Sequence, residues 1–258
     1  LLALRVVQGL LGALAAALVV LLARRLFTSE LLAALAGALY AICAPLVFYE
    51  GQLLPAALLP ALMVATALGV LSWAERRTAL AGTLAGALLA LCALTRPTAL
   101  LWLPALLLWA WRQGGLRWRS EGALLLACAL LVAPVTARNI AVEGDAVLIS
   151  ANAGLNLYIG NNDHARGSYN LPAGVWLEPG DPLDDFAGNR AAAEALGRQP
   201  SSSEASRWWA RQALSWIAEH PGRALVLMGR KALLWLNNSE IPQLYNLRGY
   251  EAVSPVLG

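Results

Sequence analysis

Arg96 is a charged side chain set between two long apolar runs, residues 79–94 and 99–110, and it is followed directly by Pro97. A guanidinium in such a place is costly and indicates a functional site. Proline prevents one unkinked helix from passing through this position. We therefore predict a turn between two membrane helices at Arg96, with its guanidinium available to an anion.

Six apolar segments precede residue 138, and the arginines between them predict an orientation. The segments are residues 1–23, 31–48, 53–73, 79–94, 98–111 and 122–137. Arginine clusters follow the first, third and fifth segments, within residues 24–25, 75–77 and 112–119. Short loops rich in arginine stay in the cytoplasm, so we expect the opposite ends of the segments to face outward.

The predicted outer face carries few charges. Glu50, Arg96 and Arg138 lie at segment ends on this side, and Arg5 begins the first segment there. Planar guanidinium groups suit phosphate, so we predict that Arg96, Arg138 and Arg5 bind the phosphate of an outer-leaflet lipid. The alternative is that each arginine only extends to the lipid headgroups.

Composition divides the chain into two parts. Apolar residues make up 59% and charged residues 14% of the chain, against about 45–50% and about 25% in soluble domains. The apolar excess lies in residues 1–138, which we predict to be a transmembrane region with about six spans, whereas residues 139–258 form an extracytoplasmic segment. The expected fold is mostly α, a polytopic membrane helical bundle with a mixed, mainly helical outer segment.

The outer segment is expected to contain a short strand over residues 146–150, a strand or a loop over 152–162, and two interfacial helices. Ser201 and Glu204 have the spacing of a capping box, which predicts the start of the first helix. The second helix covers about 223–236, and Arg230 and Lys231 interrupt its apolar residues. It therefore fits the membrane interface better than a span.

The sequence contains no pattern for a metal, a disulfide frame or a nucleotide cofactor. The three cysteines are widely spaced in apolar runs, and neither His164 nor His220 has the neighbours of a zinc site. Asp181, Asp184 and Asp185 form an acidic cluster without the spacing of a calcium loop. We predict no metal, no cofactor and no nucleic-acid partner.

Five stretches follow one another in a recognisable order over nearly the whole chain. They are residues 24–27, 48–54, 94–98, 138–139 with 154–162, and 219–221 with 230–231 and 235–242. Together they resemble bacterial members of glycosyltransferase family 39, the protein-mannosyltransferase-like group that includes the aminoarabinose transferases of lipid A. The resemblance implies an integral membrane glycosyltransferase of the C-type fold in the cell inner (plasma) membrane.

Enzymes of this family take a sugar from a polyprenyl-phosphate carrier and pass it to a lipid, glycan or protein acceptor on the extracytoplasmic side. The family's catalytic aspartate lies in the first outer loop, and this chain begins after that loop, with no aspartate before Asp145. The resemblance therefore implies a catalytic residue outside this chain and a piece that is inactive alone.

Within the chain, Glu50 is the candidate for a catalytic carboxylate because of its place on the predicted outer face. We predict that a further set of residues lines or braces an outer cavity, namely Tyr49, Asn139, Asn156, Tyr158, Asn161 and Asn162. Two alternative functions stay open. A membrane transporter or flippase would need ionisable groups in mid-span, and a non-catalytic membrane-anchored binding protein would have an outer part that folds alone.

Overall fold

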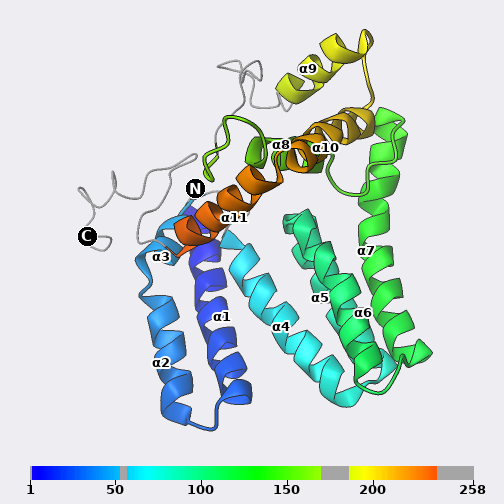
Figure 1. Ribbon diagram of the computed structural model, residues 1–258. Helices are drawn as coiled ribbons and strands as arrows, with labels where there is room; N and C mark the ends of the chain where they lie inside the picture. Colours follow the sequence, from blue (N-terminus) through cyan, green and yellow to red (C-terminus); the bar gives the residue numbers. More distant parts are fainter. Residues whose placement is uncertain (1, 53–56, 170–185, 237–258) are drawn as a thin grey trace. The chain divides into compact units, whose positions relative to one another are not determined.

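The chain forms two compact helical units in a computed structural model (Figure 1). The structure describes residues 2–52, 57–169 and 186–236. Among these, residues up to Pro134 belong to the first unit and residues from Val135 onward to the second. The acidic cluster within residues 181–185 and the family-like residues 237–242 lie outside the described residues.

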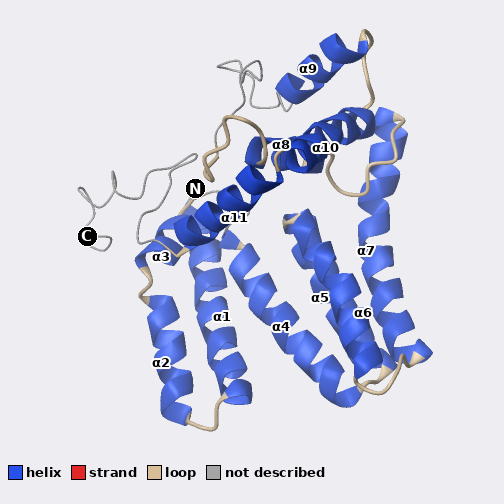
Figure 2. Cartoon of the chain, in the orientation of Figure 1, coloured by secondary structure: helices blue, strands red, loops and turns tan. Residues whose placement is uncertain are grey.

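Helices account for 81% of the described residues, which confirms a mostly α fold, and this part of the chain contains no strand (Figure 2). The strand predicted over residues 146–150 is wrong, and so is the alternative of a strand over 152–162. Residues 146–150 have no extended neighbour to pair with in the described chain. Two carbonyl oxygens of this segment, those of Val147 and Ile149, instead accept hydrogen bonds from the side-chain amide of Asn139.

The first unit contains helices at all of the predicted apolar segments. They are α1 Leu2–Leu26, α2 Glu30–Ala41, α3 Ala44–Glu50, α4 Leu59–Arg76, α5 Ala79–Thr95, the 3-10 helix η2 Pro97–Leu101, α6 Trp102–Arg112 and α7 Trp118–Glu143, whose end belongs to the second unit. Helix α1 packs against α2 and α4, and α4 packs against α5 (Figure 1).

Side-chain caps and prolines set the ends of these helices. The hydroxyl of Ser29 accepts the Leu32 N–H at the start of α2, and the hydroxyl of Thr78 accepts the Ala81 N–H at the start of α5. Pro45 lies in the first turn of α3, where proline is tolerated, and the axis bends by 54° between α2 and α3. The second apolar segment is therefore two helices instead of one.

Length and composition allow two helices, α1 and α7, to cross a membrane, and the bent pair of α2 and α3 would be a third if it forms one span. Helix α5 is apolar but shorter. The chain thus has helices suited to a membrane protein among its described residues. The predicted total of six spans stays a prediction.

Two glycines allow α5 to approach α7 closely. A Cβ on Gly82 would overlap the carbonyl oxygen of Ser120, and a Cβ on Gly86 would overlap that of Leu124. A spacing of four residues places both glycines on one face of α5. Small residues at this spacing are typical of helices that pack closely in membranes.

A buried polar cluster joins the end of α4 to the start of α7. Arg77 follows α4 in the left-handed backbone region (φ 50°) and pairs with Glu121 at 2.6 Å, with side chains that are 7% and 4% exposed. Arg77 also donates to the carbonyl of Gly115 at 2.9 Å. Beside them, the Trp73 indole donates to the hydroxyl of Ser120 at 2.7 Å. Arg77 is therefore a buried side chain, although the sequence places it in an arginine-rich loop.

The second unit is arranged around α10. Its helices beyond α7 are α8 Ala153–Gly160, α9 Phe186–Leu196, α10 Ser202–Glu219 and α11 Pro221–Trp235. Helix α10 packs against the other three, and it crosses α8 so closely that a Cβ on Gly154 would overlap the carbonyl oxygen of Ser206. The capping box predicted from Ser201 and Glu204 is confirmed, and Pro221 begins α11 directly after α10.

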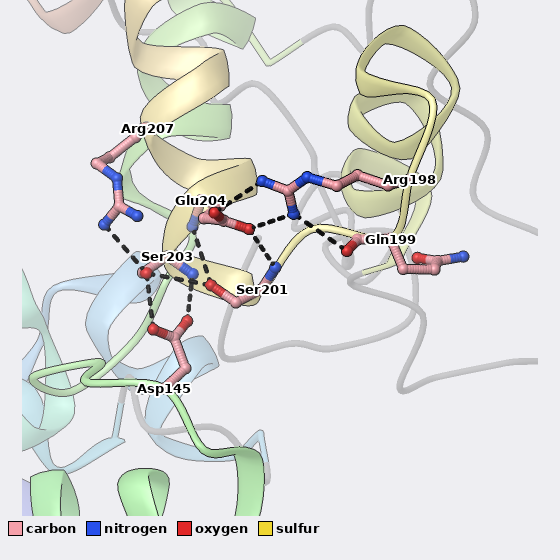
Figure 3. A network of polar contacts seen from close by, with 7 residues as sticks. All are labelled: Asp145, Arg198, Gln199, Ser201, Ser203, Glu204 and Arg207. Atoms are coloured by element: carbon pink, nitrogen blue, oxygen red, sulfur yellow. Dashed lines mark hydrogen bonds and ion pairs between the residues drawn. The ribbon is translucent and has the colours of Figure 1, made fainter.

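A polar network surrounds the first turn of α10 (Figure 3). Asp145 accepts the backbone N–H of Ser203 at 2.6 Å and its hydroxyl at 2.7 Å, and Arg207 donates to the same hydroxyl oxygen at 3.1 Å. Arg198 binds both oxygens of Glu204, at 2.8 and 2.9 Å. The bond from the Ser203 N–H lowers the pKa of Asp145, and Arg198 lowers the pKa of Glu204 to about 2.

Candidate functional site

Arg96 stands where α5 ends. Its backbone is extended (φ −140°, ψ 101°), as expected for a residue that precedes proline. Its N–H closes the last turn of α5 on the Cys92 carbonyl at 2.8 Å, and Pro97 begins η2. The guanidinium is exposed and makes no hydrogen bond or ion pair within the described chain. The predicted break at this position is confirmed.

A large apolar cavity opens beside Arg96 within the first unit. Its volume is about 730 Å³, and residues of α1, α4, α5, η2 and α6 line it. Most of the lining is leucine, alanine and other apolar residues, with Met63 and Trp102 among the larger ones. Arg96 is the only charged residue among the described residues that line the cavity. The arrangement is complementary to an amphiphile with an apolar chain and an anionic head.

The cavity runs lengthwise along α1 and α4, which point the same way. Arg25, near the end of α1, contacts Ser72 and Glu75 near the end of α4, so these two helices are parallel. The cavity is nevertheless lined by Leu26 at the end of α1 and by Leu59 at the start of α4. It therefore extends along the helices, as a long apolar chain would require.

Glu50 ends α3 and does not line this cavity. Its carboxylate accepts the Tyr40 hydroxyl at 3.5 Å and packs over Gly12 of α1, where a Cβ would overlap it. Nearby on α1, the buried Gln8 donates to the carbonyl of Gln52 at 2.5 Å. The other side-chain atom of Gln8, Oε1, has no partner in the described chain. Glu50 thus belongs to a half-buried polar cluster between α1 and the bent pair.

The other two predicted phosphate ligands, Arg5 and Arg138, are exposed side chains. Arg5 lies on α1, does not line the apolar cavity and makes no hydrogen bond or ion pair with described residues. Arg138 belongs to the second unit, where its Nη1 lies 3.5 Å from the Oδ1 of Asn139. Of the three arginines, Arg96 is the one that lines the apolar cavity.

Three of the predicted asparagines brace turns of the second unit. Asn139 is buried and holds the segment after α7. Asn162 is also buried; its amide donates to the Tyr158 carbonyl at 2.8 Å and accepts the His164 N–H at 2.8 Å. Asn161 accepts from Lys231 at 3.3 Å, which ties α8 to α11. These amides are structural, and Asn162 also lines a smaller cavity.

The remaining predicted residues have different environments. Asn156 is exposed on α8. Tyr158 packs against Trp209 with ring centroids 4.8 Å apart and lines the smaller cavity beside Asn162. Tyr49 packs edge-on against its neighbour Phe48 in the first unit.

Several cavity residues were not predicted from the sequence. In the apolar cavity, residues such as Leu22, Met63 and Trp102 come from different helices and have no local signal, because only tertiary packing brings them together. In the smaller cavity, polar residues of α10 recur at spacings of three and four, which place them on one helix face. This second pattern is readable in the sequence once the helix is known.

The chain matches no family model, no curated protein and no solved structure. Its class follows from its own residues: an α-helical protein with helices able to cross a membrane and an apolar cavity that carries one arginine.

Proposed function

We propose that the chain is part of a membrane glycosyltransferase that moves a sugar from a polyprenyl-phosphate donor to a lipid, glycan or protein acceptor on the extracytoplasmic face. The observation that carries the proposal is Arg96, a guanidinium without a partner in the described chain, on an otherwise apolar cavity of about 730 Å³. The isoprenoid chain would occupy the apolar part and the phosphate would bind Arg96. Guanidinium groups form strong paired hydrogen bonds with phosphate.

In this proposal the acceptor oxygen attacks the anomeric carbon of the sugar, and the bond from that carbon to the carrier phosphate oxygen breaks. The electron pair of that bond goes to the phosphate, where Arg96 stabilises the developing negative charge. A carboxylate takes the proton of the acceptor. The family resemblance assigns this role to an aspartate, and Glu50, the candidate within the chain, packs over Gly12 of α1 and does not line the apolar cavity, which makes it a poorer candidate.

The test is sugar transfer by the full-length protein from a polyprenyl-phosphate-linked donor. We expect Arg96→Ala to lower kcat/KM by about 10- to 150-fold, since a hydrogen bond to a charged group contributes about 1.5–3 kcal/mol. Arg96→Lys should retain part of the activity, because lysine keeps the charge but not the paired geometry.

Arg112→Ala is the matched control, since Arg112 is exposed at the end of α6 and does not line the apolar cavity. Its transfer activity should equal that of the wild type. Wild-type activity in a folded Arg96→Ala variant would reject the phosphate role of Arg96.

Transport or flipping of a lipid-linked substrate is the second candidate, and the bend between α2 and α3 favours it. Broken helices form ion and substrate sites in transporters. Tyr40 and Glu50 lie on the two sides of the 54° bend and are hydrogen-bonded to each other. Movement of the lipid across vesicles without sugar transfer, abolished by Glu50→Gln, would favour this function.

A further inference from the structure

A second cavity lies within the second unit, and polar groups dominate its lining. It has a volume of about 320 Å³. The end of α8, the turn after it and one face of α10 form its walls. The polar side chains that matter here are Tyr158, Asp163 and His164 on one part of the wall and Gln212, Ser215 and Glu219 on α10. We call it the polar cavity.

Several groups of the polar cavity are free to bind a ligand. The hydroxyl of Tyr158, the imidazole of His164 and the amide of Gln212 make no hydrogen bond within the described chain. Burial, and secondarily the charge of Asp163, raise the pKa of Tyr158, so its hydroxyl keeps its proton and can donate. Glu219 accepts the Ser215 hydroxyl at 2.6 Å through Oε1, which leaves Oε2 available.

The rest of the wall is fixed by the protein itself. Asp163 accepts the indole N–H of Trp216 at 3.0 Å and the guanidinium of Arg223 at 2.8 Å. These bonds, that of Trp216 first, lower the pKa of Asp163. Asn162 is buried, and both ends of its side-chain amide are already hydrogen-bonded, the nitrogen to the Tyr158 carbonyl and the oxygen to the His164 N–H. Contacts within the protein therefore position this part of the wall of the polar cavity without a ligand.

The charges and the size of the polar cavity narrow the class of ligand. No arginine or lysine is among the described residues that line the polar cavity, and Arg223, which contacts Asp163, is already paired with it, so the carboxylates of Asp163 and Glu219 disfavour an anion. No three His, Cys, Asp or Glu residues of the described chain group closely enough to hold a metal ion. A volume of about 320 Å³ is at the lower end of small-molecule sites, about 300–1,000 Å³.

We propose that the polar cavity binds one saccharide unit, either neutral or amino-bearing, and that this unit belongs to the acceptor. Sugar hydroxyls each donate and accept, which matches the mixture of a phenol, an amide and a carboxylate here. The role of the sugar as acceptor rests on the proposed transferase function. Sugar binding itself rests only on the polar cavity.

The experiment measures binding of methyl glycosides to the purified full-length protein by saturation-transfer NMR and titration. The probes are methyl glucoside and methyl mannoside as neutral sugars and methyl glucosaminide as an amino sugar. We expect Gln212→Ala to weaken binding of at least one probe by about tenfold. Gln199→Ala is the matched control and should bind as the wild type does, because Gln199 is exposed and does not line the polar cavity.

Glu219→Gln separates the two kinds of sugar. A larger loss for the glucosaminide than for the neutral probes indicates an amino sugar, and equal losses indicate a neutral one.

Gln212 is exposed and has no partner in the described chain, so its truncation should leave the fold intact, which circular dichroism checks. Absence of glycoside binding to the wild type, or equal affinity in folded Gln212→Ala, overturns the proposal.

Transfer assays keep the two proposals distinguishable. Gln212→Ala should raise the KM for the acceptor and leave the KM for the donor unchanged, whereas Arg96→Ala should leave glycoside binding intact. Absence of sugar transfer by the wild type together with loss of glycoside binding in Gln212→Ala would reject the transferase role and retain the sugar site, whereas normal transfer by Arg96→Ala would reject only the phosphate role of Arg96. Sugar transfer by the wild type without loss of glycoside binding in Gln212→Ala would reject the sugar site alone.

Discussion

Arg77 and Glu121 place opposite charges inside the first unit. Removing such charges from water is costly, and close geometry with additional hydrogen bonds offsets the cost. Both conditions hold here, since the ion pair is 2.6 Å long and Glu121 also accepts the Arg117 N–H at 2.7 Å. Loss of one partner would leave the other charge buried without compensation.

We predict that Glu121→Ala destabilises the protein by about 3–5 kcal/mol, the typical cost of breaking a buried pair. The double variant Arg77→Met with Glu121→Leu should recover most of this loss, because no buried charge is then left. Reversible unfolding of the detergent-solubilised protein measures both values.

The matched control for this pair is Glu30→Ala, which removes an exposed ion pair with Arg24. The side chains of Arg24 and Glu30 are 51% and 74% exposed. Exposed pairs contribute about 0–1 kcal/mol. A Glu121→Ala variant no less stable than Glu30→Ala would show that the buried pair does not hold α4 to α7.

Single residues also show which structural features can be predicted from the sequence. Pro97 indicated the helix break at Arg96, because the effect of proline on the backbone is local. The pairing of Arg77 with Glu121 joins positions 44 apart, and the contact of Glu50 with Gly12 joins α3 to α1. Neither is readable from residue type or spacing, since both depend on how helices pack.

At the scale of elements, α10 depends on the polar network of its first turn. Asp145 and Glu204 both have folded-state pKa values below those of free carboxyl groups, which are about 4. Their contribution to stability is therefore complete above about pH 4 and is lost as the pH falls through the lowered values, toward about 2 for Glu204.

We predict that the unfolding temperature of the full-length protein falls as the pH is lowered from about 5 to about 2. Asp145→Asn should flatten part of this dependence, because its side chain no longer titrates. Circular dichroism melting curves across this range measure the effect. Glu194→Gln, which changes an exposed pair with Arg190, should keep the wild-type slope, and an equally steep slope in Asp145→Asn would contradict the role of Asp145.

Helices could be predicted from the sequence where long apolar runs or caps specify them, as in α1, α5 and the start of α10. The short segment Ala153–Gly160 was not. Leu155, Leu157 and Ile159 alternate with polar or small residues, which suggested a strand, yet the segment is α8. Its helix is stabilised by close packing of Gly154 under α10, and such tertiary packing overrides a weak local pattern.

At the scale of the molecule, the chain joins helices able to cross a membrane to a second helical unit that has its own polar cavity. The first unit offers an apolar cavity with one arginine, and the second offers polar groups suited to a sugar. A transferase needs one site for the lipid-linked donor and one for the acceptor. We propose that the two cavities serve these two roles.

The most direct test of the account compares the affinity of the full-length protein for a polyprenyl phosphate and for the polyprenol of the same chain length. The wild type should prefer the phosphate by about 10- to 150-fold, the contribution of a charge-assisted hydrogen bond. Arg96→Ala should lose this preference and keep its affinity for the polyprenol, because the apolar cavity is unchanged. Equal affinities in the wild type, or an undiminished preference in Arg96→Ala, would contradict the account.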